Sequence, residues 1–143
     1  MQIDDRAVEI STANKQVHLK VLAVALPEEV AVLLEKSRQQ LKSEPAKLRE
    51  ALVAAFKTAG WASDTVDRIW SFGPRRCGPN ILLNRIKGHC GTIWTEEGPY
   101  GGNFVNGFQL ASLAGPLCEE PMMGVCFIVQ KFEEEYVYCF FVI

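Results

Sequence analysis

The sequence predicts an α+β domain, and three observations carry that prediction. Residues 17–24 alternate apolar and polar side chains, which is typical of a half-buried strand. Residues 27–60 instead place apolar side chains at helical spacing between proline and glycine signals. Two later apolar runs, 80–86 and 124–129, are short and bounded by glycine or proline, as strands are. The expected order is one strand, three helices, a strand, a helix and a strand.

Length and composition favour one globular domain. The chain has 143 residues, of which 48% are hydrophobic and 22% charged, and its net charge is −2. Its five cysteines lack paired spacing, and the first residues are acidic rather than a basic and then apolar leader. We expect reduced cysteines and a location in the cytosol or the nucleus. We expect no membrane association, because no apolar run approaches about 20 residues.

The first half is expected to contain a lead-in, a strand and three helices. Residues 1–11 have few apolar side chains and are interpreted as a lead-in. Pro27 begins the first helix, whose apolar stripe runs to Leu41. Pro45 begins the second, which Gly60 ends. Ser63 caps a third, short helix that carries three apolar residues: Val66, Ile69 and Trp70.

In the second half, residues 73–79 are expected to form a rigid basic loop between two Gly-Pro pairs. Residues 87–102 are rich in glycine and are interpreted as a mobile connection. The helix over 104–113 is apolar around much of its circumference, which predicts burial. Residues 136–143 form a continuous apolar run, which predicts either a buried strand or an aggregation-prone edge.

No catalytic or metal site is expected. Both common glycine-rich phosphate-binding patterns are absent, so we expect no nucleotide binding by this chain. His89 and Cys90 offer two adjacent ligands where structural zinc takes four. Cys77 follows two arginines but has no identifiable base, and Cys118 and Cys126 are interpreted as small core residues. Adjacent carboxylates at 119–120 suggest an acid/base pair, although a solvated turn is the favoured interpretation.

One basic cluster is a candidate RNA contact. It consists of Arg75, Arg76, Arg85 and Lys87. The planar guanidinium of arginine suits phosphate, and a rigid loop would hold it at low entropic cost. Exposed loop arginines are also commonly just solvated, so both interpretations stay open.

Two ordered blocks stand out: residues 69–74 continued by 78–82, and residues 107–111 continued by 115–120 and 124–125, with a weaker third match at Asn14-Lys15. Together they resemble the fourth domain of the elongation factor 2 family of translational GTPases, over about residues 12–130. The motif residues, interpreted as structural, are Trp70, Phe72, Gly73, Pro74, Gly78, Pro79, Asn80, Gly107, Phe108, Gln109, Gly115, Cys118, Glu119, Glu120 and Gly124. The basic 74–78 segment departs from the acidic version typical of elongation factor 2. It is most similar to the elongation factor-like GTPase 1 branch, with the spliceosomal U5 GTPase as the nearest competitor.

The resemblance implies a fold like the second domain of ribosomal protein S5, with helices on one face of a small mixed sheet that is incomplete at its C-terminus. It divides the chain into a lead-in from a preceding domain (1–11), a partial fourth domain (12–130) and a divergent apolar tail (131–143). No activity is implied for this chain, because GTP and magnesium are bound in the family by a domain absent here.

The implied role is ribosome contact within a cytosolic GTPase that matures the large ribosomal subunit by releasing an anti-association factor. The implied partners are the large subunit and the Shwachman–Bodian–Diamond syndrome protein, with no small-molecule substrate. Two alternatives stay open. In the first, the chain is a fragment of another GTPase of the family, either the translation elongation factor or the U5 spliceosomal GTPase. In the second, it is a truncated remnant without independent function.

Overall fold

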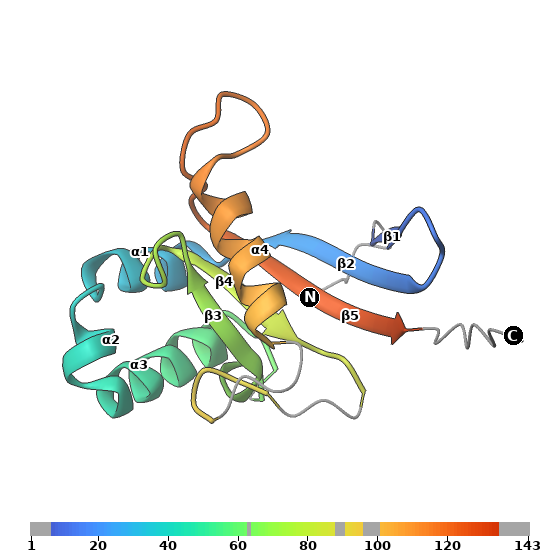
Figure 1. Cartoon of the computed structure of the whole chain (residues 1–143). Coiled ribbons are helices and arrows are strands. Elements are labelled where there is room, and N and C mark those ends of the chain that lie inside the picture. The colour runs from blue at the N-terminus through green and yellow to red at the C-terminus, as the bar shows by residue number, and fades with distance from the viewer. Residues whose placement is uncertain (1–6, 63, 88–90, 96–100, 135–143) are drawn as a thin grey trace, which may run out of the picture.

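The fold is built on a five-stranded mixed sheet with the strand order β1-β2-β5-β4-β3 (Figure 1). The structure is a computed structural model of the whole chain, and it describes residues 7–62, 64–87, 91–95 and 101–134. All neighbouring strands are antiparallel except the parallel pair β4–β5. The strands are β1 (Val8–Ser11), β2 (Val17–Ala25), β3 (Ile69–Gly73), β4 (Asn80–Asn84) and β5 (Val125–Glu134).

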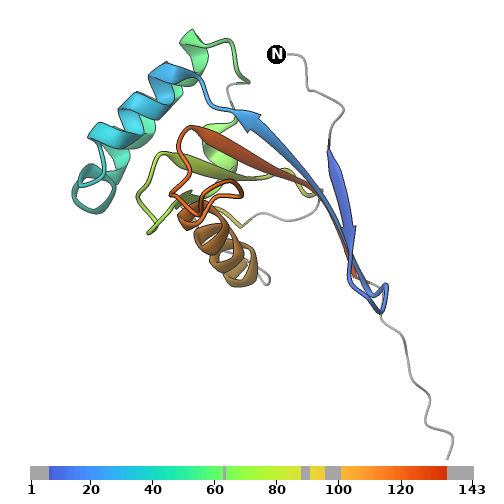
Figure 2. The same ribbon diagram turned by 90° about the horizontal axis from the view of Figure 1, so that it is seen from above.

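Helices cover both faces of this sheet. They are α1 (Glu28–Lys36), α2 (Gln40–Ser43), α3 (Pro45–Thr58), the 3₁₀ turn η1 (Val66–Arg68) and α4 (Gly101–Leu113). Helices α1 and α3 lie on one side of the sheet and α4 on the other, as the view along the sheet shows (Figure 2). The α+β class and the mixed sheet are confirmed, whereas the helices occupy two faces instead of the expected one.

Alternation along the central strands divides the core into two layers. In β4, Ile81 and Leu83 pack with α1 and α3, while Leu82 between them packs with α4. In β5, Cys126 and Ile128 face the first layer in the same way. Because successive strand side chains point to opposite faces, one uniformly apolar strand serves both layers. Among the described residues, none of the helices is long and apolar enough to cross a membrane.

Residues 8–11 form a strand where the sequence predicts only a lead-in. Strand β1 pairs with β2 from Val8↔Val21 to Ser11↔His18, and its four residues are all exposed. A strand this short and exposed buries too little apolar surface to leave a clear pattern. Its existence depends on backbone pairing with the longer β2.

The first helix is shorter than predicted. It ends at Lys36, where the N–H of the buried Ser37 donates to the carbonyls of Leu33 (3.0 Å) and Leu34 (3.3 Å). Leu41, expected on the same stripe, lies in the separate helix α2. The second helix agrees with the prediction, with Pro45 in its first turn and Gly60 beyond its end at φ +79°.

The predicted third helix is mostly strand β3. Ile69 pairs with Leu83, but Ser71 pairs with Leu82, so the register shifts by one residue at a β-bulge around Trp70. The bulge brings Ile69 and Phe72, three residues apart, to the same core. Of the three apolar residues on which the helix prediction rests, Val66 lies in η1, and Ile69 and Trp70 lie in β3. The expected cap, Ser63, lies outside the described residues.

The second half also differs in three places. Of the expected mobile connection, Ile93 is bound to the β3 edge, because its N–H donates to the carbonyl of Ile69 (2.8 Å). Helix α4 is buried on one face only, and Leu110 on its outer face is 71% exposed. Strand β5 continues to Glu134, so the first four residues of the expected tail belong to the sheet. Residues 136–143 lie outside the described part.

Candidate functional site

The turn between β3 and β4, residues 74–79, is called the arginine turn. Arg75 (φ 58°) and Arg76 (φ 60°) both adopt left-handed backbone angles. The N–H of Gly78 donates to the carbonyl of Pro74 at 3.0 Å and closes the turn. A Cβ on Gly78 would lie 2.5 Å from the carbonyl oxygen of Gly73, so only glycine fits this position.

Gln109 of α4 holds the arginine turn from one side. Its Oε1 accepts the backbone N–H of Arg76 at 2.8 Å. Its Nε2 donates to the carbonyl of Phe72 (2.8 Å) and to the hydroxyl of Ser71 (2.9 Å). A single side chain therefore links α4, the end of β3 and the turn. Gly73 makes the close approach possible, because a Cβ there would lie 2.7 Å from the hydroxyl of Ser112 in α4.

Asn80 holds the other side of the turn. It is fully buried, and its Nδ2 donates to the carbonyls of Gly73 (3.0 Å) and Met122 (2.7 Å). Its Oδ1 accepts the N–H of Val125 at 3.0 Å. The start of β4, the end of β3 and the start of β5 are thus joined through one amide.

Residues 114–124 form a second loop beside the turn. The N–H of Gly115 donates to the carbonyl of Glu120 (2.8 Å), and Glu119 has a left-handed φ of 54°. Both carboxylates are exposed, as the interpretation of a solvated turn predicts. Cys118 is exposed and not a core residue, because it lies on this loop. Cys126 is buried as predicted, and burial raises the pKa of its thiol to about 12.

The structure does not bring the four predicted cations together. Arg75 and Arg76 are exposed on the arginine turn, whereas Arg85 and Lys87 follow the opposite end of β4. Five strand residues separate the two pairs by about 17 Å at roughly 3.3 Å each. Arg85 donates to Asp64 at 2.9 Å, and this bond lowers the pKa of that carboxyl. Arg75 and Arg76 are adjacent and exposed on one turn, so these two form the candidate site.

Arg38 is a cation near the arginine turn that the sequence did not point to. A hydrogen bond to Glu35, 2.9 Å long, is the main cause that raises the pKa of Arg38. A smaller contribution comes from Cys77, so Arg38, two residues after the end of α1, lies within electrostatic range of the turn. No linear pattern connects Arg38 to residues 74–79, so only the folded chain reveals this neighbour.

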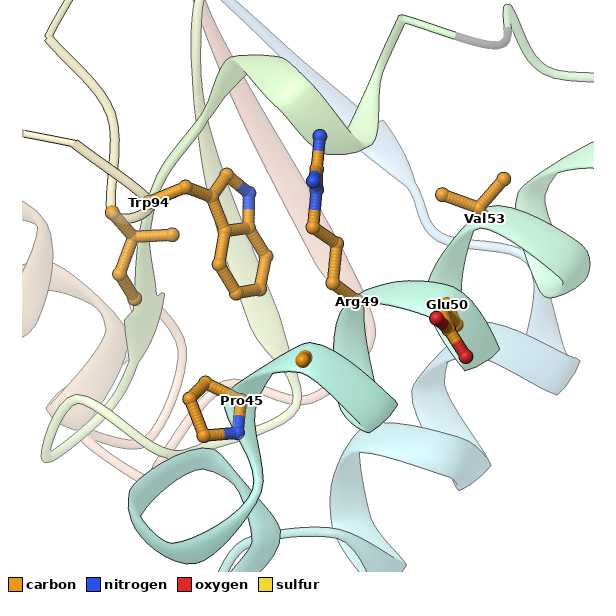
Figure 3. Close-up of a pocket in the computed structure, with 7 residues that line it drawn as sticks. Pro45, Arg49, Glu50, Val53 and Trp94 are labelled. Carbon is orange, nitrogen blue, oxygen red and sulfur yellow. The ribbon is translucent and has the colours of Figure 1, made fainter.

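A separate groove of about 600 Å³ lies between the start of α3 and Trp94 (Figure 3). The guanidinium of Arg49 lies over the Trp94 ring, 6.0 Å from its centroid, and is ion-paired with Asp67. The indole N–H donates to the carbonyl of Val66 at 2.7 Å. The guanidinium of Arg49 and the indole N–H of Trp94 thus already have partners within the protein. Among the described residues, no group of three or more potential metal ligands is assembled.

Most of the motif residues are buried or closely packed. Trp70, Phe72, Asn80 and Phe108 are buried, and the closely packed glycines admit no side chain. Gly107 differs, because a Cβ there would meet nothing within 4 Å. Many residues of the two blocks thus lie in the packed region around the arginine turn.

Comparison with known proteins identifies the class of protein to which the chain is related. Residues 43–85 match the family model described as the elongation factor-like GTPase 1-like domain. The chain is 31% identical over 117 residues to "Ribosome assembly protein 1" of Schizosaccharomyces pombe, covering 73% of the chain and 11% of that protein. The chain is thus related to elongation factor-like GTPases and to a protein named for ribosome assembly.

Within that class, two relatives make the relation specific. The chain is 36% identical over 164 residues to elongation factor-like GTPase 1 of Mus musculus, and 38% identical over 167 residues to that of Homo sapiens. These matches cover 90% and 93% of this chain. The resemblance to elongation factor-like GTPase 1 is confirmed. The chain spans 14% and 15% of the length of these two relatives.

Proposed function

We propose that the chain is a non-catalytic, ribosome-contacting module that corresponds to part of the fourth domain of elongation factor-like GTPase 1. The name of one relative, a ribosome assembly protein, supports a role at the ribosome. The names of two others, both GTPases, support a parent protein that hydrolyses GTP. The absence of phosphate-binding motifs from the sequence supports a module that leaves GTP and magnesium to another domain.

The arginine turn is the observation that carries the proposal. Left-handed angles favour glycine or asparagine, yet two consecutive arginines occupy them with exposed side chains. Such strain persists where the surroundings over-determine the backbone, and here Gln109 and Asn80 do so. A phosphate backbone is a natural partner for two guanidinium groups held on a rigid support.

The proposal extends to the setting of the whole protein. In it, the module would meet the large ribosomal subunit in the cytoplasm, while the GTPase acts with the Shwachman–Bodian–Diamond syndrome protein to release an anti-association factor. The net charge of −2 supports a local contact, because the chain as a whole does not attract RNA. Binding by the module alone should be weak and sensitive to salt.

Co-sedimentation with purified large ribosomal subunits across a salt series tests the RNA contact. Replacing both Arg75 and Arg76 by alanine removes two phosphate contacts, which should flatten the slope of log affinity against log salt by about 1.5. Lys42 and Lys57, exposed on α2 and α3, supply the charge-matched control when both become alanine. An unchanged slope in the arginine variant, or an equal change in the control, removes the arginine turn from the proposal.

A nucleotide titration tests the non-catalytic part. The isolated chain should show no saturable binding of GTP in the presence of magnesium, by fluorescence of a labelled analogue. Saturable binding that unlabelled GTP displaces would contradict the assignment of nucleotide binding to another domain.

A further inference from the structure

A cavity, called the Trp61 pocket, lies where the segment after α3 meets β4 and β5. Its volume is about 500 Å³, which is within the range of small-ligand sites. The lining includes Trp61 and Thr65 after α3, Arg85 directly after β4, and Ile128 and Gln130 of β5. The arginine turn precedes the other end of β4, so the Trp61 pocket is a different site.

The apolar part of the pocket is an aromatic wall on a closed floor. The Trp61 side chain is half-buried, and its ring packs against Phe56 of α3 with 5.3 Å between the centroids. Leu83 and Ile128, both buried, belong to the floor. A Cβ at Gly60 would meet no atom within 4 Å, so the pocket is open on that side.

Gln130 enters the pocket at a β-bulge. Lys131 pairs with Lys20 but Val129 pairs with Val21, so Gln130 is the extra residue of β5 opposite β2. Bulges redirect side chains and are common beside binding sites. The Gln130 amide has no hydrogen-bond partner in the part of the chain that the structure describes. The pocket therefore offers an adjacent donor and acceptor that the fold does not use.

The charge of Arg85 is already balanced. Its guanidinium donates to both carboxylate oxygens of Asp64 (2.9 and 3.3 Å) and to the hydroxyl of Thr65 (3.4 Å). These bonds leave some of its N–H donors unused. Because Asp64 neutralises the cation, the pocket is a poor site for a bare phosphate. Its chemistry favours a flat, neutral ligand with a polar edge.

We propose that the Trp61 pocket binds one unpaired base of single-stranded RNA. Unpaired bases stack on aromatic side chains and form hydrogen bonds through their edges. The base stacks on Trp61, and its edge pairs with the donor and acceptor of the Gln130 amide. The inference goes beyond the proposed phosphate contact, and it rests on the proposed function for the choice of RNA. A purely apolar protein side chain would leave the amide unpaired, so a base fits better.

An NMR titration of the full chain tests the inference. The probes are short single-stranded RNAs of each of the four bases, and a short RNA duplex in which the bases are paired. At least one single strand should shift the resonances of the Trp61 indole N–H and the Gln130 side-chain amide. The Trp94 indole is an internal control, because its N–H already donates to the carbonyl of Val66 in a separate groove.

A pair of matched variants measures the contribution of the amide. Gln130→Leu keeps the approximate size of the side chain and removes its hydrogen bonds, so affinity for the same strand should fall about five-fold. Gln40→Leu, exposed on α2, should bind like wild type. Neither variant changes charge, so the salt dependence of binding should stay the same, unlike that of the Arg75→Ala/Arg76→Ala protein. The two proposed sites can therefore fail separately.

The outcomes are distinct. Shifts at Trp61 and Gln130 but not at Trp94, with weaker binding by Gln130→Leu alone, support the inference. Absence of shifts with all four single strands overturns it and leaves a protein side chain as the candidate occupant. Equal shifts with the duplex also overturn it, because paired bases cannot enter the pocket. Equal affinities of Gln130→Leu and wild type would likewise contradict the base contact.

Discussion

Replacing Asn80 by alanine should destabilise the protein more than any other polar-to-alanine change at the arginine turn. The Asn80 side chain is fully buried and makes three hydrogen bonds of 2.7–3.0 Å to backbone groups of three segments. Alanine removes all three and leaves buried polar groups without that partner. At about 1–2 kcal/mol for each, the expected loss is about 3–6 kcal/mol.

This loss is large compared with the roughly 5–15 kcal/mol by which domains are stable. Thermal unfolding followed by circular dichroism should show a midpoint lower by roughly 10–20 °C, and urea unfolding gives the free energy directly. Asn106, exposed on α4, is the control, and its change to alanine should alter stability by less than about 0.5 kcal/mol. An Asn80→Ala protein within about 1 kcal/mol of wild type would show that these bonds do not hold the turn.

Two further predictions concern stability. Gly78→Ala should cost about 1–3 kcal/mol in a denaturant titration, since its Cβ would lie 2.5 Å from the Gly73 carbonyl oxygen. Gly107→Ala should instead increase the free energy of unfolding by up to about 1 kcal/mol, because alanine favours a helix and a Cβ at this position meets no other atom. If both changes stabilise the protein, or both destabilise it, the steric reasoning is contradicted. Asp64→Asn should cost under about 1 kcal/mol at pH 7, because its bond to Arg85 is largely exposed. As the Asp64 pKa is lowered in the folded state, its contribution is present above about pH 4 and is lost as the pH falls through the lowered pKa; a difference from wild type that persists in acid would be inconsistent with this.

The elements predicted well from sequence are those with local signals. Helix α3 has Pro45 at its start and Gly60 after its end, so its limits follow from backbone chemistry. Strand β2 follows from alternation. The predicted third helix rests on the helical spacing of Val66, Ile69 and Trp70, but Val66 lies in the 3₁₀ turn η1 and the other two lie in β3 at the β-bulge. The bulge is defined by pairing with β4, which no local pattern contains.

The candidate site likewise has a part that the sequence predicts and a part that only the folded chain reveals. The Gly-Pro pairs around residues 75–77 predicted a rigid basic loop, and the structure places Arg75 and Arg76 there, exposed. Its supports were not predictable as such, because Gln109 lies 33 residues from the amide it binds, and Asn80 lies 45 residues from Val125. Arg85 looked equivalent to the other arginines until its ion pair with Asp64 became visible.

The most direct test of the central claim is the affinity of three proteins for purified large ribosomal subunits at low salt. They are wild type, Arg75→Ala/Arg76→Ala and Gln109→Ala. Gln109 carries no charge, so its removal leaves both arginines present and releases the Arg76 backbone from α4. We predict that the arginine variant binds most weakly and that Gln109→Ala loses about five-fold, equivalent to one hydrogen bond of about 1 kcal/mol. Equal affinities for all three proteins would contradict the claim that a rigidly held arginine turn contacts ribosomal RNA.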